Sequence, residues 1–291
     1  MNLQNPHQQR ERRSIRSSRD ADRARSAVRT GDSAEPTKHG EAMRERLDAL
    51  AGDAPVLRVD RLIAGYGSKE TVSGVDLRLG RGQLLCLLGP NGAGKSTILH
   101  AIFGLADIRG GRVEVGGRNV TRLGPNAKLR EAGIACVLQG SSLFPDMTVE
   151  RNLWLGGYLM RDRADARQAA ERIFERYPWL ASRRNDPARA LSSGERRLLE
   201  LARALVMQPR LLLIDEPSMG LGAAFSDRIF EMLHDLRDRD ELSILMVEQN
   251  AKRALALADI GCVVACGEIA MVGTGAELLG DPAVGRLFLG G

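Results

Sequence analysis

Nine consecutive residues constrain the fold of this chain more than any other stretch: Gly89-Pro90-Asn91-Gly92-Ala93-Gly94-Lys95-Ser96-Thr97. They match the pattern G-x-x-x-x-G-K-[ST] at every position. The apolar run over 84–88 predicts a buried strand before them, and apolar residues repeat at helical spacing from Ile98 to Phe103. A phosphate-binding loop requires this order of strand, glycine-rich turn and helix, because backbone N–H groups and the helix N-terminus converge on the phosphates. We therefore expect these residues to bind a nucleotide, with Lys95 at the outer phosphates and the Ser96 hydroxyl on Mg²⁺.

A second motif follows another apolar run, over 211–214, which ends in Asp215 and Glu216. A carboxylate at the tip of a strand beside the loop is suited to hold Mg²⁺, and the next carboxylate is suited to orient or deprotonate an attacking water. Two acidic residues that merely end a strand would be unremarkable. Together with the upstream loop, however, they predict Asp215 as a metal ligand and Glu216 as the catalytic base of nucleotide hydrolysis.

A third motif, Leu191-Ser192-Ser193-Gly194-Glu195, lies between the other two and opens a predicted helix. Free N–H groups at this helix start would form a second anion site, and a plain capped helix is the alternative. With this motif the chain resembles the ATP-binding subunits of ABC transporters, whose signature reads L-S-G-G-Q or L-S-G-G-E. The resemblance covers residues 56–291. Ser193 stands where the signature has glycine, so its Cβ lies where the family's backbone approaches a phosphate.

The resemblance implies roles for residues outside the three motifs. Tyr66 matches the aromatic residue that stacks on adenine, and Gln139 matches the glutamine that senses Mg²⁺ and the transmembrane partner. The family usually has a histidine at the γ-phosphate after the strand expected at 244–247. Gln249 stands there instead, and it can donate a hydrogen bond but cannot carry a proton as histidine can. Residues 218–221 match the loop that crosses the dimer interface.

The same resemblance implies that the chain works as half of a head-to-tail pair. The cofactors would be ATP and Mg²⁺, with each ATP held between the loop of one subunit and the Ser192, Ser193 and Gly194 turn of the other. We expect a heterodimer with a second ABC ATPase subunit. Two transmembrane permease subunits and, indirectly, a periplasmic or extracellular solute-binding protein would complete the system.

One branch of the family is indicated by three further stretches, 144–153, 247–250 and 287–291. They are similar to the smaller ATP-binding subunit of branched-chain amino-acid uptake systems, and of the related urea systems. That branch often has Glu in place of Gln139 and an arginine pair in place of Ser141 and Ser142. We predict an ATPase that powers import of branched-chain amino acids, with a urea, amide or other small-solute importer as the alternative.

Two other classes of protein compete with a transporter subunit. Soluble ABC-type ATPases that do not transport carry two motif sets, zinc insertions or long coiled coils, and this sequence shows one copy of each motif and none of those additions. A phosphotransferase would need an acceptor site, which no motif suggests. The four cysteines include no C-x-x-C pair, so we expect no zinc site.

The pattern of apolar residues predicts an α/β P-loop ATPase core with a mainly parallel sheet, an antiparallel β layer and an inserted helical subdomain. The ATP-binding domain is expected over 54–291 with the helical subdomain at about 146–207. Residues 1–53 hold few large apolar side chains and are predicted to be a disordered basic extension.

Charge and hydropathy indicate where the chain works. The first 30 residues hold eight arginines against three acidic residues, which accounts for the whole net charge of +5. The body is therefore balanced, and we expect no nucleic-acid partner. No apolar run approaches the roughly 18 residues that span a bilayer, and the N-terminus does not resemble a signal peptide. We expect a cytoplasmic protein, peripheral on the inner face of the membrane through its permeases.

Overall fold

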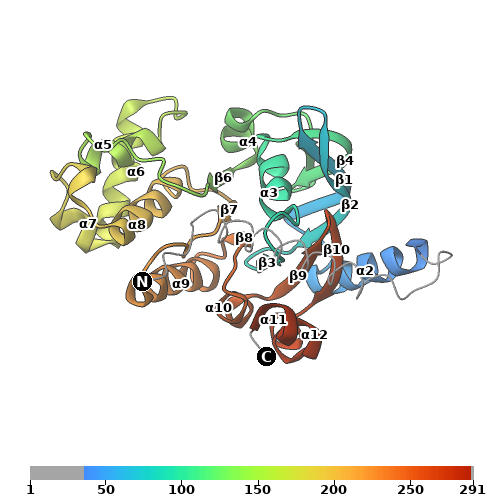
Figure 1. Cartoon of the computed structure of the whole chain (residues 1–291). Helices are drawn as coiled ribbons and strands as arrows, with labels where there is room; N and C mark the ends of the chain where they lie inside the picture. Colours follow the sequence, from blue (N-terminus) through green and yellow to red (C-terminus); the bar gives the residue numbers. More distant parts are fainter. Residues whose placement is uncertain (1–35, 290–291) are drawn as a thin grey trace, which may run out of the picture. The chain divides into compact units, whose positions relative to one another are not determined.

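The computed structural model describes residues 36–289. The chain divides into two compact units, Met1–Met43 and Arg44–Gly291. The second unit holds every motif described above and is built from two sheets and the helices that cover them (Figure 1). The predicted disorder of residues 1–35 lies outside the described residues.

A six-stranded sheet has the strand order β10-β9-β3-β8-β7-β6. All neighbours pair in parallel except β10, which pairs antiparallel with β9 at one edge. Alternate side chains of β3 enter two separate cores, with Leu84 and Cys86 in one and Leu85 and Leu87 in the other. Because both faces of these strands are buried, they read in sequence as continuous apolar runs. The strands are β3 (Leu84–Leu88), β6 (Ile134–Val137), β7 (Leu211–Asp215), β8 (Ser243–Val247), β9 (Ile260–Ala265) and β10 (Glu268–Gly273).

A four-stranded antiparallel sheet has the order β2-β1-β4-β5, which confirms the predicted antiparallel layer. Leu77 and Val113 are buried in the core that this sheet shares with one face of the parallel sheet. Gly116 and Gly117, both with positive φ, make the tight turn between the last two strands. The strands are β1 (Leu57–Tyr66), β2 (Lys69–Leu79), β4 (Asp107–Val115) and β5 (Arg118–Asn119).

Helices cover both faces of the parallel sheet, because each carries one apolar stripe. Helix α3 packs in the core on the side of the antiparallel sheet, and α8, α9 and α10 pack in the other core. The helices are α2 (Pro36–Ala51), α3 (Lys95–Phe103), α4 (Pro125–Ala132), α5 (Val149–Gly156), α6 (Arg163–Arg176), α7 (Pro178–Ser182), η1 (Ala188–Ala190), α8 (Ser193–Ala204), α9 (Ala223–Asp238), α10 (Ala251–Leu257), α11 (Gly275–Gly280), α12 (Pro282–Val284) and the single turn η2 (Gly285–Leu289).

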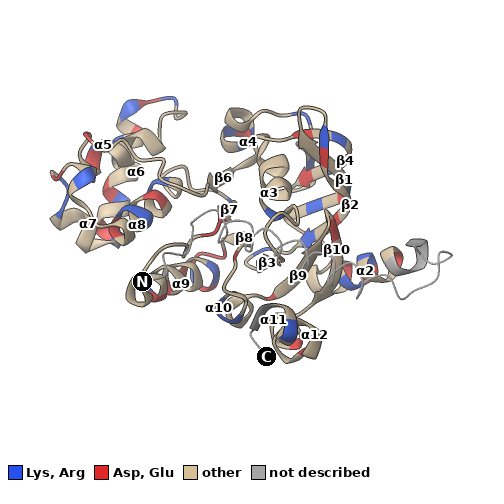
Figure 2. Ribbon diagram, in the orientation of Figure 1, with Lys and Arg blue, Asp and Glu red and all other residues tan. Residues whose placement is uncertain are grey.

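Helices α5 to α8 occupy the stretch where the sequence predicts an inserted helical subdomain. Acidic and basic residues are mixed along these helices (Figure 2). Arg184 joins two of them, because its guanidinium pairs with Glu150 of α5 and Glu171 of α6. An asparagine, Asn152, is fully buried and satisfies its amide on the backbone of the preceding loop, including the carbonyl of Phe144 at 3.0 Å. Ion pairs and one buried amide therefore supplement a modest apolar core.

The disorder predicted for residues 1–53 is wrong for the last part of that stretch, because residues 36–51 form helix α2. Within the second unit, Leu47 is only 1% exposed and joins the core beneath the antiparallel sheet. The helix also reaches the chain's far end, where Arg46 pairs with Glu277 of α11. The sequence pattern was misleading because only a few large apolar residues mark the buried side of this helix.

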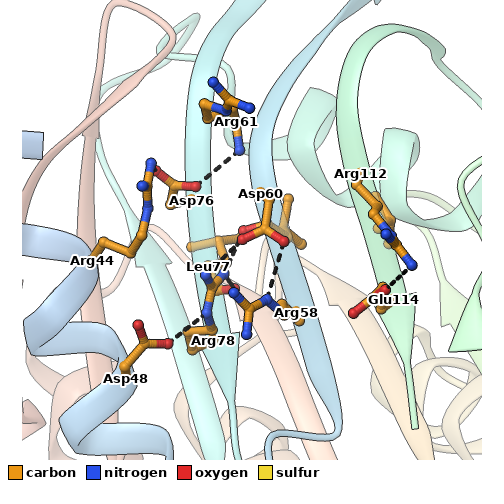
Figure 3. Close-up of polar contacts among 12 residues, drawn as sticks. Arg44, Asp48, Arg58, Asp60, Arg61, Asp76, Leu77, Arg78, Arg112 and Glu114 are labelled. Carbon is orange, nitrogen blue, oxygen red and sulfur yellow. Dashed lines mark hydrogen bonds and ion pairs between the residues drawn. The ribbon is translucent and has the colours of Figure 1, made fainter. Parts of the chain in front are cut away.

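Figure 3 shows the polar contacts that hold α2 against the antiparallel sheet. The central residue is Arg78 of β2, whose side chain is fully buried. Its guanidinium donates to Asp48 of α2 at 2.7 Å, to Asp60 of β1 at 2.6 Å and to the carbonyl oxygen of Val59 at 2.6 Å. Arg44 pairs with Asp76 at 2.9 Å beside this group. A buried guanidinium is costly unless its donors are satisfied, so Asp48 supplies part of what allows Arg78 to lie here.

A buried lysine gives the protein a stability term that depends on pH. Lys128 of α4 is fully buried and donates to the carbonyl oxygens of Ala101 and Ile102 at the end of α3. Burial lowers its pKa from 10.5 to about 8. Between these values the unfolded chain binds a proton that the folded chain does not, so this residue's contribution to stability rises with pH.

We expect the free energy of unfolding to rise between pH 8 and 10 more steeply in the wild type than in Lys128→Met. The negative end of the α3 dipole favours the charged lysine, so the difference should be roughly 1–2 kcal/mol rather than the full linkage value. Urea unfolding of both proteins across this pH range measures it. Parallel pH profiles for the two proteins would contradict the assignment.

Candidate nucleotide-binding and hydrolysis site

The predicted phosphate loop lies between β3 and α3, in the order that the sequence indicates. Gly89, Gly92 and Gly94 have φ angles of 155°, 80° and 105°, in the region that favours glycine. A Cβ on Gly89 would lie 2.3 Å from the carbonyl oxygen of Val264, so no larger residue fits there. No side chain caps the start of α3, which leaves its first N–H groups available to an anion. The loop is therefore shaped as a cradle for phosphate groups.

Lys95 lies against its own loop. Its ammonium donates to the carbonyl oxygens of Gly89 at 2.8 Å and Pro90 at 3.1 Å, and the side chain is buried. Burial lowers the pKa of Lys95, while the carboxylates of Glu216 and Asp215 oppose that shift. A cation already held at the mouth of the loop is suited to exchange these carbonyls for phosphate oxygens.

Ser96 and Asp215 come together from the first turn of α3 and the end of β7. The Ser96 hydroxyl donates to Asp215 Oδ1 at 3.1 Å, and Asp215 is buried. Burial raises the pKa of the Asp215 carboxyl, and the hydrogen bond from Ser96 opposes the shift. Among the described residues no group of three or more His, Cys, Asp and Glu side chains could hold a metal. A hydroxyl beside one carboxylate fits Mg²⁺, which takes oxygen ligands from one or two side chains and completes its shell with phosphates and water.

Glu216 is held from both sides by amide groups. Gln139 follows β6 and donates its Nε2 hydrogen to Glu216 Oε2 at 2.9 Å. Gln249 follows β8 and donates its Nε2 hydrogen to Glu216 Oε1 at 2.6 Å. Glu216 itself has φ 46°, an uncommon conformation for a residue with a side chain. The structure thus brings together three predicted residues at the ends of three neighbouring strands, with the carboxylate oriented by the other two.

Two residues that the sequence reasoning missed support this arrangement. Glu248 is buried and accepts hydrogen bonds from the Ser218 hydroxyl and, at 2.6 Å, from the Gln249 N–H. Arg197 of α8 donates to the carbonyl oxygens of Leu138 at 2.7 Å and Asp215 at 2.8 Å. The sequence did hold a signal for Arg197, because it is a charged residue on the apolar stripe of a predicted helix. A charged side chain buried at such a position needs polar partners.

The other predicted residues lie further out. Tyr66 ends β1 with its ring 44% exposed, as a surface for stacking requires. Ser192 caps α8, and its hydroxyl and the Glu195 carboxylate form a reciprocal capping box. Gly194 packs against Phe225 of α9, with no room for a Cβ. Within residues 36–289 no hydrogen bond joins the Ser192–Gly194 turn to the phosphate loop, so the two halves of the expected ATP site do not meet in one chain through such contacts.

The comparisons with known proteins agree with this geometry. The ABC transporter family matches residues 72–219. A branched-chain amino-acid transport ATP-binding protein, BraG of Pseudomonas aeruginosa, is 37% identical over 81% of this chain and 100% of its own length. This chain belongs to the ABC transporter family. Its fold and its identification as an ATP-binding, ATP-hydrolysing member, both predicted from the sequence, are confirmed.

Further relatives show how wide the similarity is. LivF of Archaeoglobus fulgidus, a probable branched-chain amino-acid transport ATP-binding protein, is 36% identical over 81% of this chain and 99% of its own length. The lipopolysaccharide export ATP-binding protein LptB of Haemophilus influenzae is 32% identical over 81% of this chain and 97% of its own. A crystal structure of the ADP conformation of an ABC transporter cassette matches with a TM-score of 0.72 at 25% identity, over 82% of this chain and 100% of that one. None of the described helices could cross a membrane.

Proposed function

We propose that this ABC ATPase powers the import of branched-chain amino acids. The observation that carries its catalytic part is the Glu216 carboxylate, held by Gln139 and Gln249 beside a phosphate loop. The names of BraG and LivF support the substrate class. Within that similarity, the stretch Val247-Glu248-Gln249-Asn250 resembles the smaller ATPase of those importers.

In this proposal the loop from Gly89 to Thr97 binds the phosphates of ATP and Tyr66 stacks on adenine. Lys95 exchanges its two loop carbonyls for phosphate oxygens. Ser96 and Asp215 would hold Mg²⁺, together with Gln139. When bound, the metal neutralises charge that develops on the transferred phosphoryl group.

Glu216 accepts a proton from the attacking water in the same scheme. Gln139 and Gln249 hold the Glu216 carboxylate in one orientation before the reaction begins. The reaction therefore does not have to supply the free energy that would fix this side chain. Gln249 donates its hydrogen bond to Glu216 through an amide, a group that does not itself gain or lose a proton as histidine does. As the family resemblance implies, Gln139 would report the state of this site to a permease. Its Nε2 also lies 3.1 Å from the Met219 sulfur in the loop after β7.

The second half of each ATP site would come from another subunit, through its equivalent of the Ser192, Ser193 and Gly194 turn. Because Ser193 adds a side chain to this turn, we propose a heterodimer with a second ABC ATPase whose signature is complete. Two permease subunits would attach the pair to the inner face of the membrane, and a solute-binding protein would deliver the amino acid. The names of BraG and LivF, as transport ATP-binding proteins, support the transport role on which this assembly depends.

Reconstitution tests this function. The chain is purified together with a second ABC ATPase and two permease subunits, and the complex is placed in liposomes with the solute-binding protein. We expect ATP-dependent uptake of leucine, isoleucine or valine, and only weak ATPase activity from the chain alone. A complex that hydrolyses ATP but moves urea, or extracts lipopolysaccharide as the similarity to LptB would suggest, would refute the substrate. Full turnover by the isolated chain would refute only the heterodimer.

A further inference from the structure

A histidine that the proposed mechanism does not use joins two distant parts of the site. His100 lies on α3, and its Nδ1 is 2.6 Å from the hydroxyl oxygen of Tyr66. Its other ring nitrogen, Nε2, is 3.7 Å from Asp215 Oδ2. His100 therefore stands between the aromatic ring proposed to carry adenine and the carboxylate proposed to hold Mg²⁺.

The position of His100 on its helix explains how one side chain reaches both. Ser96 and His100 are four residues apart, so they share one face of α3 and lie one above the other. Ser96 hydrogen-bonds Oδ1 of Asp215 and His100 faces Oδ2, so the two residues lie at opposite oxygens of the same carboxylate. Tyr66 comes from a different layer, at the end of β1, and meets His100 edge-on with ring centroids 6.4 Å apart.

The two contacts differ in strength. At 2.6 Å the contact with Tyr66 is a short hydrogen bond, and its direction follows from the surroundings. If the Tyr66 hydroxyl donates to Nδ1, the ring proton sits on Nε2 and faces the Asp215 carboxylate, which is the favourable arrangement. At 3.7 Å the second contact is longer than a hydrogen bond and acts as a charge–dipole attraction that orients the ring.

The ordinary alternative is a histidine that merely fills space. The side chain of His100 is one-quarter exposed, and both of its ring nitrogens face polar atoms, which an apolar residue of similar size would leave without this partner. Tyr66 is 44% exposed, and within the described residues its hydroxyl has His100 as its hydrogen-bond partner. Without His100 the ring of Tyr66 would lose this polar restraint and sample more rotamers before nucleotide binds.

We propose that His100 is a positioning residue that couples the Tyr66 ring to the Asp215 carboxylate, so that engagement of the adenine base and of Mg²⁺ are energetically linked. This inference rests on the roles proposed above for Tyr66 and Asp215. The Tyr66 hydroxyl does not touch the Asp215 carboxylate, because His100 lies between them. If the coupling is real, removing this hydroxyl must still change the Mg²⁺ concentration that nucleotide binding requires. If Tyr66 and Asp215 acted independently, removing the Tyr66 hydroxyl would not change this dependence on Mg²⁺.

A double-mutant cycle on the full chain tests the coupling. The wild type, Tyr66→Phe, His100→Ala and the double variant are titrated with Mg²⁺ and the β,γ-imido analogue of ATP, which is not hydrolysed. Each single change should weaken nucleotide binding by about fivefold, which corresponds to the usual net free energy of one hydrogen bond. The double variant should bind no more weakly than His100→Ala, and both single variants should need more Mg²⁺ for half-maximal binding.

Three controls separate this result from general damage. Tyr158→Phe removes the hydroxyl of a tyrosine that is 80% exposed on the helical part and should change nothing. His100→Gln should recover part of the affinity for the nucleotide analogue, because its amide can both accept and donate hydrogen bonds. If His100→Ala does not fold, His100→Gln takes its place in the cycle. Lys95→Ala should abolish tight binding.

The outcomes distinguish the two proposals. If the effects of Tyr66→Phe and His100→Ala multiply, or if His100→Ala binds as the wild type does, the coupling is refuted while the nucleotide site stands. If Lys95→Ala binds the analogue normally, the nucleotide site itself is wrong. Non-additive losses with a shifted Mg²⁺ requirement support the coupling, because a purely structural role would not move the metal dependence.

Discussion

Glu216→Gln should reduce ATP hydrolysis by about 10²–10⁴-fold while leaving ATP binding intact, which is the usual contribution of a general base. The substitution keeps the shape of the side chain. One of the two glutamines that now donate to the two carboxylate oxygens can still donate to the remaining carbonyl oxygen, and the other can turn its amide to accept from the new NH2 group. It removes the negative charge that would take the proton from water. The carboxylate is buried, so no bulk water can easily replace its function.

Phosphate release by the complete transporter complex measures this effect, and equilibrium binding of labelled ATP measures the part that should not change. Glu231→Gln is the matched control, because Glu231 is exposed on α9 and lies outside the site. Hydrolysis by Glu216→Gln within threefold of the wild type would remove Glu216 from its proposed role. Loss of ATP binding would instead show that the carboxylate supports the loop rather than the reaction.

Leu47→Ala should lower the free energy of unfolding by about 2–5 kcal/mol, the usual cost of truncating a buried leucine. Leu47 is 1% exposed and, with Ala51, places α2 in the core below the antiparallel sheet. The cavity would also loosen the helix that supplies Asp48 to the buried guanidinium of Arg78. The melting temperature should fall by roughly 5–15 °C for a domain of this size.

The matched control is Leu105→Ala, which deletes the same atoms at a position that is 44% exposed. It should change the melting temperature by less than about 2 °C, since exposed substitutions are usually worth less than 0.5 kcal/mol. Calorimetry or circular dichroism on the full chain compares the two variants. Equal melting temperatures for Leu47→Ala and the wild type would mean that α2 adds nothing to the stability of the domain.

The nucleotide-binding part of the fold was predictable because its signals are local. The loop motif, the two acidic residues after 211–214 and the alternation of apolar and polar residues each occupy a few consecutive positions. Parallel strands bring their carboxyl ends to one edge of a sheet, so residues that follow such strands were expected to meet there. Gln139, Glu216 and Gln249 do follow β6, β7 and β8, which are neighbours in the observed strand order.

Helix α2 shows where local signals failed. Its buried side is marked mainly by Leu47 and Ala51, too few apolar residues to stand out from a polar extension. What stabilises it lies elsewhere in the chain, in Arg78 on β2 and Glu277 on α11. A helix with a weak apolar stripe forms when tertiary contacts add to its propensity, and these contacts join residues up to 231 positions apart.

The sequence by itself determined the class of the protein: a P-loop ATPase with one set of nucleotide-binding motifs, a helical insertion and an antiparallel layer. It did so because phosphate binding needs a particular order of strand, glycines, lysine and hydroxyl that few other structures require. Only the tertiary structure decided which groups restrain one another. The clamp of Gln139 and Gln249 on Glu216, the bridge of His100 between Tyr66 and Asp215, and the helix over Arg78 all join separate elements. A hydrogen bond depends on distances of a few tenths of an ångström, and those are set by the packing of whole strands and helices rather than by neighbouring residues.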